Sequence, residues 1–230
     1  MFPEVLADRI RSVLSAAGLP CPDDALRVAR PLRSEHGDYS TPVALRLAST
    51  TGRDPVELAE IVVAGLRQVD GIESVTIRAS HVNVSFTPDD LAATARELSR
   101  RSPAPERPAG DEAVEPAESA ELSETRAELS RLLRGADALG VREEPVDPAD
   151  LSSPAQRQLI CVLAETAWLA KRKPERLPSH FAEIVLLWQR VEMVQPILPA
   201  GDEIPTIRHS SGRLLVAATR ATLAGVEALP

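Results

Sequence analysis

The segment HGDYSTPVALRLA, residues 36–48, lies where the pattern of the first part of the chain changes from strand to helix. Before it, apolar residues alternate with polar ones over residues 26–32, which predicts a short strand. After its first residues we expect a short helix over residues 41–50 that ends at Gly52. The tetrapeptide at residues 36–39 therefore joins a strand to a helix, and the N-terminus of a helix is a position that favours anions.

Two interpretations of this tetrapeptide are open. In the structural one, Gly37 makes a tight turn, Asp38 or Thr41 caps the helix, and Tyr39 is half-buried. In the functional one, side chains of the segment bind an anion. The spacing alone favours the structural interpretation. No cysteine, serine or carboxylate pair is fixed beside His36, so the sequence nominates no catalytic site.

Helical and alternating patterns are mixed over the first hundred residues. Asp54-Pro55-Val56-Glu57 predicts a helix start, with Asp as N-cap, Pro at the first position and Glu three residues after the cap. Two β-rich runs, residues 72–77 and 82–86, are separated by about four residues and predict a hairpin. A further helix is expected from residue 87 to residue 101. The sequence thus predicts an α+β N-terminal domain over residues 1–101, a small sheet covered by helices.

The composition changes sharply after this domain. Residues 102–120 hold four prolines and many acids with almost no large apolar residue, which is typical of an extended, mobile linker. Residues 121–230 are helical in pattern throughout and predict an all-α antiparallel helical bundle. Ser153-Pro154 and Ser179 are expected to start two of its helices. The four expected helices lie near residues 121–138, 154–171, 179–194 and 211–228.

The charge of the chain is uneven. The 230 residues carry 26 Lys and Arg against 34 Asp and Glu, a net charge of −8. Residues 103–150 carry 5 basic and 13 acidic groups, so this segment alone has a net charge of −8. Residues 151–230 carry 9 basic and 7 acidic groups. This is not the charge pattern of a general nucleic-acid binder, although a small local patch could still contact RNA.

Several classes of site and location are not predicted. Two cysteines and scattered histidines give no metal site, and the absence of Gly-rich phosphate loops argues against a bound nucleotide, so we expect no cofactor. No apolar run approaches the roughly 18 residues of a membrane span, and the first residues lack a signal-peptide pattern. We therefore expect a cytoplasmic protein without a membrane or metal partner.

One dense basic cluster stands out in the helical part. It holds Lys171, Arg172, Lys173 and Arg176, and both lysines of the chain belong to it. These cations could meet phosphate, or they could complement a helix C-terminus in solvent, and the second interpretation is favoured. Trp168 and Trp188 fall on the apolar stripes of their helices, which favours core packing over base stacking.

The order of these elements resembles that of arginyl-tRNA synthetases. Residues 36–48 are similar to the signature of the family's N-terminal additional domain, residues 52–59 to its next helix start, and residues 75–86 to its hairpin. Beyond the linker, the chain resembles the family's anticodon-binding domain, of the type called DALR. The segments that carry this second resemblance are residues 130–134, 183–198 and 216–220.

The resemblance also implies what the chain lacks. In the family, a class I catalytic domain with HIGH and KMSKS-like motifs lies between these two regions, where this sequence has the 19-residue linker over residues 102–120. The tetrapeptide at residues 36–39 is not the HIGH motif. We therefore expect a chain that is not an enzyme and does not charge tRNA with arginine.

Some residues depart from the family's RNA-reading pattern. Pro42 replaces an Asn, and Ala79-Ser80-His81-Val82 replaces a glycine-rich loop with a Phe, which leaves Asn83 in register. The loss of that aromatic ring removes a stacking platform worth roughly 1–3 kcal/mol per base. In the second domain, residues 124–128 and Val191-Glu192 stand where the family has aromatic or basic residues. Acid facing an anticodon loop is unfavourable.

Two main functions remain after this comparison. The first is a non-catalytic, synthetase-related accessory module that still binds tRNA. The second is a protein-interaction or regulatory module that has lost its RNA-reading surface, with arginyl-tRNA synthetase or another protein as partner. An independent enzyme is the least supported class. The candidate RNA-binding residues are Arg33, His36, Tyr39, Asn83, Lys171, Arg172, Lys173 and Arg176.

Overall fold

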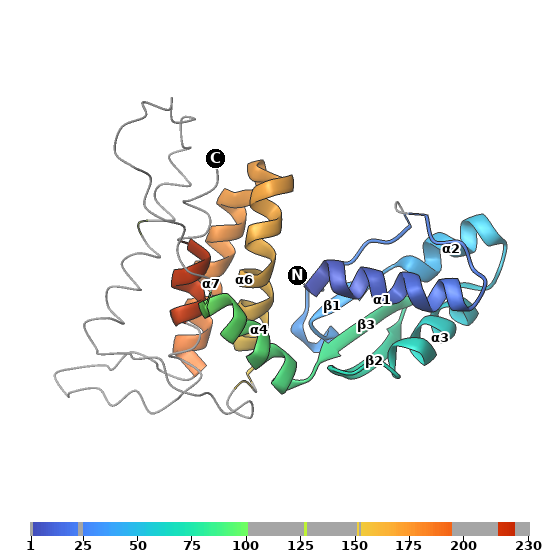
Figure 1. Cartoon of the computed structure of the whole chain (residues 1–230), viewed down its shortest axis with the longest axis horizontal. Coiled ribbons are helices and arrows are strands. Elements are labelled where there is room, and N and C mark those ends of the chain that lie inside the picture. Colours follow the sequence, from blue (N-terminus) through green and yellow to red (C-terminus); the bar gives the residue numbers. More distant parts are fainter. Residues whose placement is uncertain are drawn as a thin grey trace. The chain divides into compact units, whose positions relative to one another are not determined.

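The computed structural model describes residues 2–22, 25–100, 127, 151, 153–194 and 216–223 (Figure 1). The chain divides into two compact units, Met1–Asp90 and Leu91–Pro230, and each unit is described by itself. The predicted linker over residues 102–120 lies outside the described residues, so the domain limits at 101, 102–120 and 121–230 stay predictions.

The first unit combines three helices with a three-stranded antiparallel sheet of order β1-β3-β2 (Figure 1). A single turn of 3₁₀ helix, η1, precedes the first strand, and α4 begins at the end of the unit. The bounds of these elements are α1 Phe2–Ala16, η1 Ser34–His36, β1 Tyr39–Thr41, α2 Val43–Thr51, α3 Pro55–Leu66, β2 Ile72–Arg78, β3 His81–Phe86 and α4 Pro88–Arg100.

One face of the sheet is apolar and forms the core. Tyr39, Val84 and Val75 lie side by side across the three strands, because the register pairs Val84 with both of the others. All three are buried. Helices α2 and α3 pack on the sheet, and α1 packs on α3, where Gly65 of α3 lies directly against Val13 of α1. The predicted α+β architecture is confirmed for this unit.

The opposite face of the sheet is polar across all three strands. Ser40, Asn83 and Thr76 form its central row, since Asn83 is the register partner of both neighbours. The pairs Ser74–Ser85 and Arg78–His81 continue the same face on either side, because directly opposite residues of an antiparallel pair point to one side of the sheet. We call these seven residues the polar face.

The β hairpin is tighter than the sequence indicates. Strands β2 and β3 are joined by two residues, Ala79 and Ser80, whose φ angles are +47° and +57°. Positive φ at both central residues is the geometry that matches the twist of a two-residue hairpin. The tight turn extends β2 by one residue beyond the predicted end, to Arg78.

The prediction of a strand over residues 26–32 is wrong. In this region only Ala29 forms a bridge, with Ser40 of β1, and Leu32 is fully exposed. Pro31 has no amide hydrogen to give to a ladder, which interrupts pairing there. The third strand is instead β1, in residues that the sequence assigns to a turn and to the start of a helix.

Helix starts with short-range signals were predicted correctly. Asp54 Oδ1 accepts a hydrogen bond of 2.6 Å from Val56 N, and Pro55 occupies the first position of α3. Glu57, expected to complete the cap, instead pairs with Arg53. In the second unit, Ser153 N donates to Gln156 Oε1 over 3.3 Å at the start of α6.

The described part of the second unit is helical. It includes α6, Pro154–Arg172, the 3₁₀ turn η3, Pro174–Arg176, α7, Leu177–Val194, and helical residues 216–223. Helices α6 and α7 pack together, and buried His180 lies at their contact with Nε2 3.0 Å from Val162 O and 3.1 Å from Thr166 Oγ1. The predicted bundle is therefore confirmed in part, because most of residues 121–138 lie outside the described chain.

Two predictions about α7 have different outcomes. Ser179 does not start the helix, since its hydroxyl donates to Arg176 O and α7 already begins at Leu177. Trp188 packs in the core as expected: it is 8% exposed and its Nε1 donates to Thr219 Oγ1 over 3.1 Å. The side chain of Trp168 lies outside what the structure describes.

The junction at the start of α4 gives a pH-dependent prediction. Burial raises the pKa of Asp90 above its usual 3.8, and the nearby Arg9 partly opposes that rise. The folded state therefore favours the protonated carboxyl, and the stabilising effect of protonation is lost as the pH rises through the folded-state pKa, which lies above 3.8. We expect Asp90→Asn to gain stability relative to wild type as the pH rises through that pKa.

Urea denaturation of both proteins at several pH values measures this difference. Asp89→Asn removes the same charge from an exposed neighbour in the same helical turn and serves as the control. A constant difference between Asp90→Asn and wild type on both sides of the folded-state pKa would show that the burial of Asp90 carries no linkage.

Within the described ranges, no helix is both long and apolar enough to cross a membrane.

Candidate nucleic-acid interface

Gly37 and Asp38 attach the tetrapeptide of residues 36–39 to strand β3. Asp38 is 4% exposed, its N–H donates to Val84 O over 2.9 Å, and its Oδ2 accepts from Phe86 N over 2.8 Å. Gly37 has φ +91°, and a Cβ built on it would lie 2.7 Å from Val84 O. Only glycine permits this close approach. The two residues therefore have structural roles.

Tyr39 and Thr41 complete the structural interpretation, with two corrections. Tyr39 is fully buried rather than half-buried, and its ring meets the ring of Phe86 edge-on at 6.1 Å. Asp38 does not cap α2, because its carboxylate is held by β3. Thr41 does assist the helix start, since its Oγ1 accepts from Val43 N over 3.2 Å.

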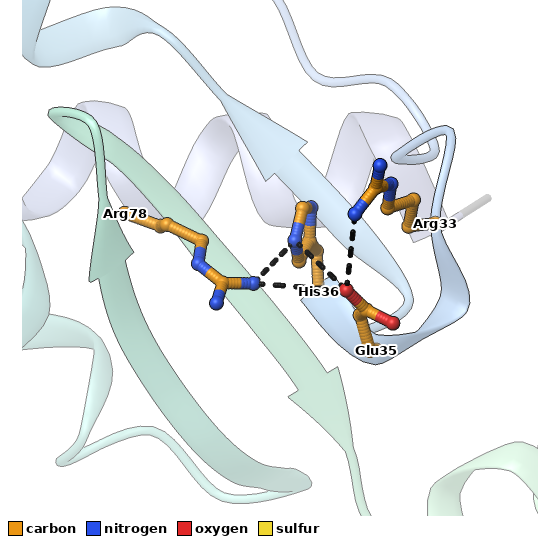
Figure 2. A network of polar contacts seen from close by, with 4 residues as sticks. All are labelled: Arg33, Glu35, His36 and Arg78. Carbon is orange, nitrogen blue, oxygen red and sulfur yellow. Dashed lines mark hydrogen bonds and ion pairs between the residues drawn. The ribbon is translucent and has the colours of Figure 1, made fainter.

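His36 is the member of the tetrapeptide that faces a polar network (Figure 2). Arg78 Nη1 lies 2.5 Å from His36 Nε2. Glu35 Oε1 lies 3.6 Å from Arg33 Nη1, 3.7 Å from His36 Nε2 and 3.9 Å from Arg78 Nη1. We call Arg33, His36 and Arg78 the basic cluster. It brings together the turn before β1 and the end of β2, which are far apart in the sequence.

The protonation of His36 follows from its partner. Arg78 is always charged and can only donate, so a hydrogen bond to Nε2 requires a lone pair there and assigns the proton to Nδ1. Nε2 then cannot also donate to Glu35. In this arrangement His36 Nε2 is an acceptor, and the carboxylate of Glu35 interacts with the two guanidinium groups.

The cluster is open to solvent. The side chains of Arg33 and Arg78 are 73% and 64% exposed, and that of Glu35 is 62% exposed, whereas His36 is only 26% exposed. Arg78 also belongs to the polar face of the sheet, so the cluster and that face are continuous. Together they form one surface that carries positive charge at one end and hydroxyl groups along its length.

The other predicted site residues of the first unit are more buried. Asn83 is 5% exposed and lies in the central row of the polar face, between Ser40 and Thr76. Tyr39 lies on the opposite, apolar face.

The predicted basic residues of the second unit surround a break between helices. Lys171 and Arg172 end α6, and Lys173, its C-cap, donates from its backbone N–H to Leu169 O over 2.7 Å. Arg176 ends η3. Lys173 and Arg176 are exposed, and the side chains of Lys171 and Arg172 lie outside what the structure describes. The predicted position at a helix C-terminus is confirmed for Lys171, Arg172 and Lys173, whereas Arg176 lies in the turn that follows.

Sequence reasoning missed two residues of the network, Arg78 and Glu35. Arg78 lies one residue beyond the predicted end of its strand, so the sequence pattern predicts no cross-strand neighbour for it. The sequence shows that Glu35 is next to His36. Its contact with Arg78 depends on the register between β2 and β3, which the sequence does not show. A two-residue turn at Ala79–Ser80, had it been assumed, would have placed Arg78 on the polar face.

Among the described residues, no group of three or more His, Cys, Asp or Glu side chains lies close enough to hold a metal ion.

Comparisons with known proteins relate the first unit to one family. Residues 4–86 match the family described as "Arginyl tRNA synthetase N terminal domain". Arginine–tRNA ligases of Bifidobacterium longum and Frankia alni are 37% identical over 106 residues and 36% identical over 109 residues. The ligase of Kineococcus radiotolerans is 38% identical over 109 residues.

These matches are partial in both directions. They cover 41% to 44% of this chain and only 17% to 19% of the three ligases. The strongest resemblance expected from residues 36–59 and the hairpin falls inside the matched region, whereas the resemblance to a DALR domain lies beyond the family match. The chain is therefore arginyl-tRNA-synthetase-like over its N-terminal region.

Proposed function

We propose that this chain is a non-catalytic, synthetase-related accessory module that binds tRNA. The observation that carries the proposal is the continuity of the basic cluster with the polar face, inside the region related to the N-terminal domain of arginyl-tRNA synthetases. The proposed ligands include tRNA that is already charged with arginine.

The chemistry of this surface suits single-stranded or looped RNA. Arginine binds phosphate oxygens through charge-assisted and often paired hydrogen bonds. Hydroxyl groups, such as those of Ser40 and Thr76, can bond to base edges and to ribose hydroxyls, which is how proteins read unstacked RNA. The rings of Tyr39 and Phe86 are buried and cannot stack on bases, so phosphate contacts carry most of the affinity.

We expect Arg33→Ala/Arg78→Ala to weaken tRNA binding by about tenfold at 50 mM salt. Each arginine neutralises about one phosphate, so the double variant should also show a shallower dependence of affinity on salt. Filter binding with total tRNA at about 50 and 200 mM salt measures both effects. Wild-type binding should weaken with salt more steeply than binding by the variant.

The matched control is Arg11→Ala/Arg53→Ala. It removes the same charge from residues that are paired locally with Asp8 and Glu57, away from the basic cluster. Equal binding by the two double variants would place the RNA contact elsewhere. The non-catalytic part is tested separately by arginine-dependent pyrophosphate exchange, in which activity above background contradicts it.

The alternative, a protein-interaction module, is supported by the acidity of residues 103–150. An acidic segment repels RNA and attracts a basic protein partner. Absence of tRNA binding at 50 mM salt, together with recovery of arginyl-tRNA synthetase on the immobilised chain, would favour this alternative.

A further inference from the structure

Resting on the proposed RNA contact, we propose that Glu35 is an internal competitor for the phosphate site of the basic cluster. Its carboxylate occupies the position among Arg33, His36 and Arg78 that a phosphate oxygen of bound RNA would take. RNA binding then requires the displacement of Glu35, and this displacement limits affinity at the site.

The distances show an anion position that Glu35 fills incompletely. A single carboxylate oxygen, Oε1, lies between 3.6 and 3.9 Å from three side-chain nitrogens, two of which belong to guanidinium groups (Figure 2). Each distance is longer than a charge-assisted hydrogen bond, which is typically about 2.7–2.9 Å. The carboxylate therefore contributes charge without close bonding. A phosphodiester shares one negative charge between two non-bridging oxygens and, unlike Glu35, is not tethered to η1, so it can approach both guanidinium groups directly.

The charges of the cluster leave room for an external anion. Within the described ranges, Glu35 is the one carboxylate at ion-pair distance from Arg33 or from Arg78. One acid thus faces two permanent cations, Arg33 and Arg78, while His36 Nε2 accepts a hydrogen bond from Arg78. Displacement of Glu35 would expose both guanidinium groups to the incoming phosphate.

Glu35 is also free to leave. Its side chain is 62% exposed, and it belongs to η1, a turn of three residues. Exposed ion pairs of this kind contribute little to stability because water screens them. Rotation of the side chain into solvent would break its contacts with Arg33 and Arg78 and would leave the hydrogen bond between Arg78 and His36 in place.

The test is the isosteric variant Glu35→Gln, measured by filter binding with total tRNA. At 50 mM salt we expect about three- to tenfold tighter binding than wild type, from the loss of one competing charge at roughly 4 Å. This gain in affinity should vanish when Glu35→Gln is added to Arg33→Ala/Arg78→Ala, because Glu35 can compete with RNA only where the two arginines are present. Glu60→Gln, an exposed acid on α3, controls for net charge.

Three outcomes decide the proposal. Tighter binding that depends on Arg33 and Arg78 supports it. Binding by Glu35→Gln that equals wild type, or a gain no larger than that of Glu60→Gln, overturns it. If wild type and Glu35→Gln both fail to bind tRNA, the proposed RNA function fails and the role of Glu35 is decided with inorganic phosphate.

In that phosphate experiment, the NMR signals of the His36 ring are followed during titration at constant ionic strength. Saturation of Glu35→Gln at a lower phosphate concentration than wild type supports the competitor role for a free phosphate ligand. Identical titrations overturn it. Thermal melting of each variant checks that the exposed substitution leaves the fold intact.

Discussion

Replacement of Gly37 by alanine is expected to destabilise the first unit by about 3 kcal/mol or more. The left-handed backbone at φ +91° costs an alanine roughly 1–2 kcal/mol. The new Cβ would also lie 2.7 Å from Val84 O, a backbone atom that cannot move away because it accepts the hydrogen bond of Asp38 N. The two costs act together, so the junction between η1 and the sheet should open.

Gly52→Ala is the matched control for this prediction. Gly52 also has positive φ, +69°, but a Cβ there meets nothing within 4 Å, so only the backbone cost of about 1 kcal/mol remains. Urea denaturation can be followed by the near-ultraviolet signal of Tyr39, the single tyrosine of the chain, which is buried against Phe86. Equal midpoints for the two variants would contradict the steric argument.

The second large effect is expected where α1 and α3 meet. A Cβ on Gly65 would overlap both methyl groups of Val13, and a β-branched side chain has little freedom to move aside. We expect Gly65→Ala to lose about 1–3 kcal/mol, although alanine is the better helix former by about 1 kcal/mol. The overlap therefore outweighs the gain in helix propensity.

A double-mutant cycle isolates this contact. Val13→Ala alone should lose about 1 kcal/mol of packing, while Gly65→Ala/Val13→Ala should be more stable than Gly65→Ala alone. The coupling free energy from urea denaturation should then be about 1–2 kcal/mol in favour of the double variant. Additive losses would mean that the helices shift apart without strain.

Short-range signals explain which parts of the fold could be predicted. The start of α3 depends on Asp54 and Pro55, and the start of α6 depends on Ser153 and Gln156, so three or four neighbouring residues contain the information. Strand β1 is different, because Tyr39–Thr41 is a strand only through its pairing with Val82–Val84 of β3. That pairing joins residues more than forty positions apart, and no local pattern reports it.

The candidate site divides in the same way. The sequence pattern singles out residues 36–39 and Arg33 as candidates. In the structure, Gly37, Asp38 and Tyr39 instead hold the segment on the sheet. The functional candidate is His36 together with Arg78, a residue that no motif includes. Such a contact follows from the register of β2 and β3, which the two-residue turn at Ala79–Ser80 determines.

The polar face has a consequence for the evolution of this domain. Ser74 and Thr76 are exposed on β2, and neither contributes to the core beneath the sheet. Exchanges at such positions usually change stability by less than about 0.5 kcal/mol. Mutations there can accumulate without loss of the native state. A lineage, or a library built in the laboratory, could therefore explore new ligand preferences on this side of the sheet while the opposite side keeps the molecule folded.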